Sequence, residues 1–114
     1  MADELRVCRV DDLERGQSLR IEAQPGMTTD IALHRVGDDF YATDDLCTHE
    51  RWSLGEDGAL EGHEIVCCLH MAAFDVRDGS ATRFPATVPL KVYPVRIVDG
   101  EVWVGLNPKC IGQQ

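Results

Sequence analysis

Cys47-Thr48-His49 and Cys67-Cys68-Leu69-His70 are two short motifs, separated by residues 50–66, that each offer one thiol and one imidazole. Thiolate sulfur and imidazole nitrogen are the protein ligands of zinc sites and of some iron–sulfur centres. One Cys-x-His pair arises easily by chance, but a second mixed pair within reach of the same domain does not. The sequence therefore predicts a metal centre with Cys47, His49, Cys67 and His70 as ligands.

The order of these ligands distinguishes two kinds of metal centre. Zinc sites with two cysteines and two histidines normally place both cysteines in one short motif and both histidines in the other. Here each motif carries one of each. That set suits a [2Fe–2S] centre in which two histidines bind one iron and two cysteines bind the other. The alternative is a zinc-stabilised interaction module without a redox role.

Several further stretches carry a likeness to one family. They are residues 47–54, 60–62, 67–71, 74–79, 85–86 and 90–95. Over nearly its whole length the chain resembles the Rieske ferredoxins of bacterial aromatic-ring dioxygenase systems, above all the biphenyl and toluene types. The resemblance implies one Rieske-type [2Fe–2S] cluster per chain, bound by the four residues named above, and no catalytic residues.

The resemblance also implies a function and partners. Such a ferredoxin takes single electrons from a flavin-dependent NAD(P)H reductase and passes them to a terminal Rieske oxygenase. It is an electron carrier and not itself an enzyme. The chain has no glycine-rich dinucleotide loop, so flavin and nicotinamide belong to a partner. A rival within the family is an accessory Rieske subunit of another oxidoreductase, such as the small subunit of a nitrite reductase.

Size and charge limit the remaining possibilities. With 114 residues, 44% of them hydrophobic, the chain is expected to form one domain over residues 1–114. Twenty acidic residues against 11 basic ones give a net charge of −9, which argues against binding nucleic acid or anionic membranes. We find no secretion signal and no apolar run of membrane-spanning length, so we expect a cytoplasmic protein, and a monomer.

Short alternating apolar segments, separated by turn signals, predict strands. These segments are 5–10, 19–23, 31–36, 40–43, 65–67, 74–76, 92–98 and 102–106. Asp99-Gly100 predicts a two-residue hairpin between the last two strands. The pattern indicates an all-β fold, an antiparallel sandwich or small barrel. The only helical candidate is one turn at 11–15, capped by Asp11, and the residues from Asn107 on are expected to form a loose tail.

Both motifs follow predicted strands and therefore lie in loops. We expect a cluster-binding subdomain of about residues 44–84, inserted in a larger sheet, with a third loop near 84–86 covering the cluster. Trp52, Met71 and Pro85, next to the ligands, are candidates for an apolar surface that meets a partner.

Overall fold

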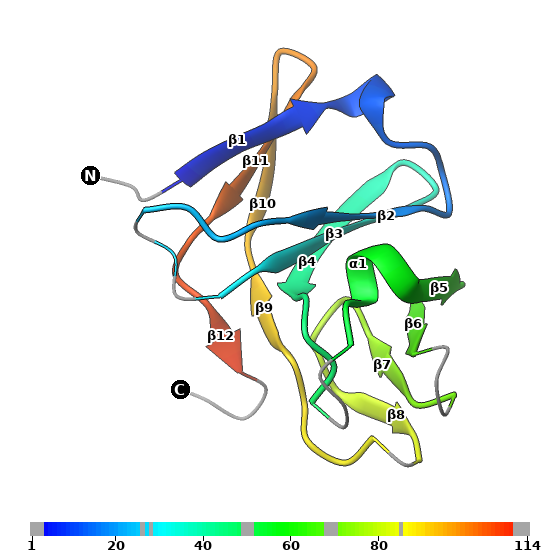
Figure 1. Cartoon of the computed structure of the whole chain (residues 1–114). Coiled ribbons are helices and arrows are strands. Elements are labelled where there is room, and N and C mark those ends of the chain that lie inside the picture. The colour runs from blue at the N-terminus through cyan, green and yellow to red at the C-terminus, as the bar shows by residue number, and fades with distance from the viewer. Residues whose placement is uncertain are drawn as a thin grey trace.

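Three antiparallel sheets make up the protein (Figure 1). The computed structural model describes residues 4–25, 27, 29–48, 52–67, 71–84 and 86–110, without the side chain of Cys110. The first sheet has the order β1 (Glu4–Arg9), β11 (Glu101–Gly105), β10 (Val95–Val98). The second has the order β12 (Lys109–Cys110), β9 (Lys91–Tyr93), β4 (Asp39–Asp44), β3 (Ile31–Val36), β2 (Ser18–Ile21). The third joins β5 (Gly58–Glu61), β6 (Glu64–Cys67), β7 (Ala73–Asp75) and β8 (Ala81–Arg83). The predicted all-β, antiparallel fold is confirmed.

The predicted hairpin at Asp99-Gly100 joins β10 to β11. Both turn residues have positive φ, 51° for Asp99 and 76° for Gly100, as a type I′ turn requires. Val98 pairs with Glu101 at the end of the ladder. The turn therefore fixes the register of the hairpin that forms most of the first sheet.

The predicted single strand over 92–98 is wrong, because the chain changes sheets at Pro94. β9 pairs with β4 of the second sheet, whereas β10 pairs with β11 of the first. Proline has no N–H to donate to a ladder, and the carbonyl oxygen of Pro94 accepts a 2.8 Å hydrogen bond from the Gly105 N–H. The proline therefore divides the segment into two strands.

The helical prediction and the tail prediction also need correction. Residues 11–15 do not form a helical turn; a 3-10 turn spans Val10–Asp12, and Asp12, not Asp11, accepts a hydrogen bond from the Arg9 N–H at 2.9 Å. The α-helix is instead α1 (Leu54–Asp57), where the Ser53 hydroxyl accepts a bond from the Glu56 N–H. The chain after Asn107 is not loose throughout, because β12 pairs with β9.

Two separate apolar cores share no described residue. The first lies between the first two sheets and includes Cys8, Ile31, Leu33, Tyr93 and Val102. The second lies within the third sheet, α1 and the neighbouring loops, and its buried members are Cys47, Leu54, Ile65, Cys67, Ala72, Phe74, Val76, Ala86 and Leu90. Both predicted cysteine ligands thus belong to one core. The subdomain bounds of 44–84 stay a prediction.

Within the part of the chain that the structure describes, no helix has the length and apolarity needed to cross a membrane.

Candidate metal centre

The first ligand loop is closed at its base by backbone pairing. Leu46 and Ser53 form an antiparallel bridge, and the Cys47 N–H donates a 2.9 Å hydrogen bond to the carbonyl oxygen of Trp52. One residue further down, the Leu54 N–H donates to the carbonyl oxygen of Asp45 at 2.7 Å. Cys47 is therefore held at the point where two paired chain segments diverge.

The second ligand loop is closed in a similar way at the end of β6. The Cys67 N–H donates to the carbonyl oxygen of Ala72 at 2.7 Å, and the Met71 N–H donates to that of Cys67 at 2.9 Å. Met71 has φ of 60°, a left-handed conformation that costs a non-glycine residue about 1–2 kcal/mol. Such strain persists where the surroundings require one particular loop geometry.

The two cysteines lie in a site that suits thiolate coordination. Cys47 is 4% exposed and Cys67 is fully buried, both within the second core. A buried apolar site with two sulfur donors fits a metal centre that must be shielded from water. His49 and His70 lie outside the described residues, so the full ligand set stays a prediction. Among the residues that are described, no group of three or more His, Cys, Asp or Glu side chains forms a possible metal site.

A third loop packs against the first, while its predicted role as a cover over the cluster stays a prediction. The Thr48 hydroxyl donates a 2.7 Å hydrogen bond to the carbonyl oxygen of Val88. Ala86 is buried in the same core as the cysteines, and the Leu90 N–H donates to the carbonyl oxygen of Gly79 at 2.8 Å. We call residues 46–53, 67–72 and 84–90 the three loops.

The three loops expose large apolar side chains. Phe84 is 83% exposed and Met71 51%, and Trp52 is also exposed. Trp52 and Met71 were expected from the sequence, whereas Leu46, Phe84 and Val88, which are exposed as well, were not. Pro85 lies outside the described residues. Isolated apolar residues in loops give no sequence signal of exposure, because the same residues are usually buried.

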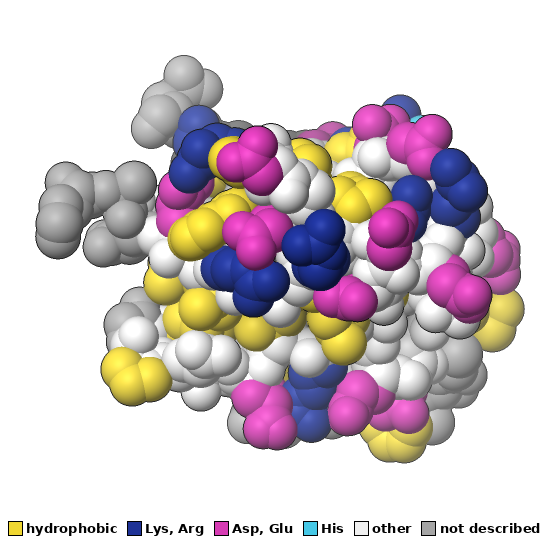
Figure 2. Space-filling view, turned by 90° about the horizontal axis from the view of Figure 1, so that it is seen from above, with side chains coloured by type: hydrophobic (Ala, Val, Ile, Leu, Met, Phe, Trp, Pro, Cys, Tyr) yellow, Lys and Arg dark blue, Asp and Glu magenta, His cyan; other side chains and the backbone are white. Residues whose placement is uncertain are grey.

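The opposite end of the molecule has a different surface. Figure 2 shows it from above, with cationic and anionic side chains side by side and hydrophobic side chains among them. The first sheet there carries the ion pairs Arg6–Glu101 and Arg96–Glu4. Among the described residues, the exposed large hydrophobic side chains are mostly in the three loops, with Leu19 in β2 and Ile97 in β10 as the others.

Asp45 is a buried acid beside the first loop that sequence analysis missed. The residue is buried, and its Oδ1 accepts hydrogen bonds from the Gly55 N–H at 2.8 Å and from the Ser53 hydroxyl at 3.0 Å. Burial raises the pKa of this carboxyl, while those two donors and Arg20 act in the opposite direction. The pattern Asp-Leu-Cys gave no hint of burial, because acids before a loop are usually solvated.

The two other histidines have structural environments. His34 in β3 is buried, with Nε2 2.9 Å from the Thr43 hydroxyl and Nδ1 2.7 Å from the Ser18 hydroxyl. Because the Thr43 hydroxyl donates to the Asp44 carbonyl, Nε2 is the donor and Nδ1 the acceptor. Burial lowers the pKa of His34 to about 3, so the ring is neutral. His63 packs edge-on against Tyr41, with ring centroids 5.8 Å apart.

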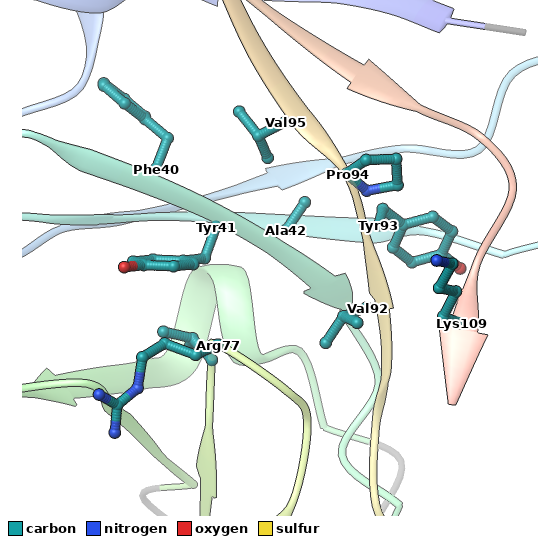
Figure 3. Close-up of a pocket in the computed structure, with 10 residues that line it drawn as sticks. Phe40, Tyr41, Ala42, Arg77, Val92, Tyr93, Pro94, Val95 and Lys109 are labelled. Atoms are coloured by element: carbon teal, nitrogen blue, oxygen red, sulfur yellow. The ribbon is translucent and has the colours of Figure 1, made fainter. Parts of the chain in front are cut away.

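A cleft of about 330 Å³ lies on the side of the molecule (Figure 3). Its lining includes Phe40 and Ala42 of β4 and Tyr93 of β9, and Arg77 and Lys109 lie on opposite sides of it. Neither Cys47 nor Cys67 lines it. The cleft is therefore not the metal centre.

Residues 3–94 match the family model for the Rieske [2Fe-2S] domain. The chain belongs to this family. It carries the family's Rieske-type [2Fe–2S] cluster, which excludes the zinc module. The match begins one residue before β1 and ends at Pro94, so it includes both cysteine loops.

Curated relatives are similar over nearly their full length. The chain is 38% identical to the ferredoxin component of the p-cumate 2,3-dioxygenase system of Pseudomonas putida, over 94% of this chain and 89% of the relative. It is 40% identical to the biphenyl dioxygenase ferredoxin subunit of Pseudomonas sp. strain KKS102, over 90% and 91%. These relatives are named as ferredoxin components, not as catalytic subunits.

Solved structures agree with this placement. One is the complex of reduced oxygenase and oxidized ferredoxin in carbazole 1,9a-dioxygenase. A chain of that complex is 40% identical to this protein and superposes with a TM-score of 0.88. The match covers 96% of this chain and 98% of that one. The Sphingomonas yanoikuyae B1 ferredoxin is 35% identical, covers 90% and 97%, and has a TM-score of 0.81.

Proposed function

We propose that this protein is the ferredoxin of a multicomponent aromatic-ring dioxygenase and carries single electrons to the terminal Rieske oxygenase. The observation that supports this most directly is the placement of Cys47 and Cys67. Two buried thiols in one apolar core, each at the base of a hydrogen-bonded loop, suit a [2Fe–2S] cluster. The full-length similarity to ferredoxin components favours a carrier over a catalytic subunit.

The proposed ligands are Cys47, His49, Cys67 and His70. When bound, the cluster supplies one-electron chemistry in a potential range of roughly −150 to +300 mV. Cys47 and Cys67 hold their side from within the apolar core and exclude water there. A ligating histidine keeps one ring nitrogen free, which makes a solvent-facing imidazole a suitable point of contact with a partner.

The exposed apolar residues of the three loops are the proposed docking surface for the oxygenase. Transient redox complexes bury a small area, under about 1,200 Å², which a few exposed side chains such as Phe84, Met71 and Val88 can supply. A structural relative is a ferredoxin found in complex with its oxygenase. The net charge of −9 favours partners with basic surfaces.

Three further parts of the proposal concern its cellular setting. The electron donor is a flavin-dependent NAD(P)H reductase, because the sequence has no dinucleotide-binding loop of its own. The protein acts as a cytoplasmic monomer. The aromatic substrate is chosen by the oxygenase and not by this chain.

The first test is cluster content. Purified protein should contain equal iron and acid-labile sulfide and, after reduction by dithionite, give the rhombic paramagnetic resonance signal of mixed nitrogen and sulfur ligation. Cys67→Ser and His49→Ala should lose the cluster, whereas Cys8→Ala and His63→Ala, which change residues outside the predicted ligand set, should keep it. Retention of a normal spectrum by His49→Ala would contradict the ligand assignment.

The second test is electron transfer. Reduced protein should be reoxidised by an aromatic-ring oxygenase in the presence of its substrate and oxygen, with product formed in proportion. A nitrite reductase small subunit has a similar structure but is only 22% identical, which shows the shared fold alone. Reoxidation by a nitrite reductase catalytic subunit, and not by the oxygenase, would favour that rival.

A further inference from the structure

Asp45 connects the two ends of the loop that carries Cys47. The residue directly follows β4, and its backbone carbonyl accepts the Leu54 N–H at 2.7 Å. Its Oδ1 accepts two more bonds from the returning segment, at 2.8 Å from the Gly55 N–H and at 3.0 Å from the Ser53 hydroxyl. One side chain thus holds both ends of the loop together.

The site is built for this contact. A Cβ at Gly55 would lie 2.8 Å from Asp45 Oδ1 and 2.7 Å from the backbone nitrogen of Arg20. Only a glycine lets the start of α1 approach both the carboxylate and β2. The Asp45 side chain is 1% exposed, so its hydrogen bonds scarcely compete with solvent.

The second carboxylate oxygen of Asp45, Oδ2, has a different environment from Oδ1. Oδ2 is buried and accepts no hydrogen bond from the residues that the structure describes. The Nε of Arg20 is 3.7 Å away, while the Arg20 guanidinium is bonded to Asp30 at 2.7 Å and to Glu56 at 3.0 Å. An asparagine would make the same Oδ1 bonds without burying a charge, so loop closure alone does not require an aspartate.

A charge at this position acts on the cluster. Asp45 is two residues from Cys47, so their Cα atoms are at most about 7 Å apart. A buried negative charge in the segment that leads directly into the Cys47 loop opposes the addition of an electron to a cluster bound there. We propose that Asp45 is a positioning residue with two effects: Oδ1 fixes the Cys47 loop, and the carboxylate charge favours the oxidised cluster. The inference rests on the proposed function only in assuming a redox-active cluster.

Two variants separate these effects. Asp45→Asn keeps an oxygen acceptor and the shape of the side chain but removes the charge. Its one-electron equilibrium constant for reduction should rise about tenfold, a midpoint shift of about 59 mV upward, with cluster content and spectrum unchanged. Ser53→Ala removes one bond to Oδ1 and keeps the charge. It should leave the one-electron equilibrium constant for reduction within a factor of two of the wild-type value and speed the loss of visible absorbance in chelator.

The matched control is Asp57→Asn, which removes an exposed acid from the other end of α1. All midpoints are measured by optical redox titration at one slightly alkaline pH. The control should shift the equilibrium constant less than threefold. A midpoint for Asp45→Asn equal to that of wild type, or to that of Asp57→Asn, would overturn the proposal.

A variant of opposite sign covers the case in which Asp45→Asn does not assemble a cluster. Arg20→Gln removes the cation shared by Asp45, Asp30 and Glu56, so the midpoint should fall. An unchanged or higher midpoint for Arg20→Gln would refute the charge effect. If wild-type protein lacks a cluster, the proposed function itself is refuted. If the midpoints of the variants shift as expected but the reduced protein does not reduce an oxygenase, only the proposed function is refuted and the role of Asp45 stands.

Discussion

The Thr48 hydroxyl and the Val88 carbonyl oxygen, forty positions apart in sequence, are joined by a 2.7 Å hydrogen bond. Thr48 lies between two proposed ligands, and Val88 lies in the loop that contributes Ala86 to the cysteine core. This bond connects the first and third loops at the exposed end of the site. The bond therefore ties the third loop to the first, and we expect it to help hold the third loop as a cover over the metal centre.

Replacing Thr48 by valine should loosen this cover. The change keeps the shape of the side chain and removes the donor, at a cost of about 1 kcal/mol. We expect the visible absorbance of the oxidised protein to decay about fivefold faster in chelator. Thr87→Val, at an exposed position in the same loop, is the matched control and should decay at the wild-type rate. Equal decay of both variants would contradict the role of the bond.

Phe84 should be an anchor for the oxygenase. A large aromatic side chain that is 83% exposed has little packing to lose, and its burial in a complex yields apolar area. Phe84→Ala should raise the apparent KM for the ferredoxin in an oxygenase assay about tenfold, without a change in the cluster spectrum. Ile97→Ala, which removes a 47% exposed side chain from β10, should leave KM unchanged. A similar effect of both changes would place the interface elsewhere.

Buried His34 should make the protein less stable in mild acid. Its pKa is about 3 in the folded protein and 6.5 when the ring is exposed to water, so below pH 6.5 the unfolded chain binds a proton that the folded chain does not. The free energy of unfolding should therefore fall by about 2 kcal/mol between about pH 8 and pH 5. Urea unfolding at several pH values measures this slope. In His34→Gln the slope over the same range should be much smaller, whatever the absolute stability of the variant.

Two glycines offer a matched test of the third sheet. Gly79 has φ of 83°, and a Cβ there would collide with the Leu90 carbonyl oxygen. Gly62 has φ of 62° with nothing within 4 Å of such a Cβ. Gly62→Ala should cost about 1 kcal/mol of folding free energy, and Gly79→Ala about 3 kcal/mol or more, with weakened cluster binding. Equal costs in thermal unfolding would show that the packing of Leu90 over Gly79 is unimportant.

The fold class followed from local patterns, but several elements did not. The strand over 31–36 and the hairpin at Asp99-Gly100 were predictable, because a run of apolar residues and a pair of turn residues determine the backbone conformation locally. β5 and β8 were missed, since short polar sequences such as Ala81–Arg83 become strands only by pairing with a neighbour. Helix α1 was missed because Gly55 and Gly58 indicate a turn, whereas Gly55 serves the close approach to Arg20.

The part of the site that depends on residue type and spacing could be predicted from the sequence. Cysteine and histidine at fixed spacing predict the kind of metal centre and four ligands, of which the structure brings Cys47 and Cys67 into one core, while the roles of His49 and His70 stay a prediction. Asp45 and Phe84 were not predictable. Their properties, burial for the one and exposure for the other, depend on where distant segments pack and run against the usual behaviour of their residue types.

Among the described residues, none belongs to both apolar cores, so the two cores can accept substitutions largely independently during evolution. Substitutions around Cys47 and Cys67 alter packing in the second core, which touches the larger sheet through Val36 and Tyr41, while the contacts among Ile31, Leu33 and Val102 belong to the first core. We expect related proteins to acquire new redox partners through substitutions in the third sheet and the three loops, while the first two sheets change little.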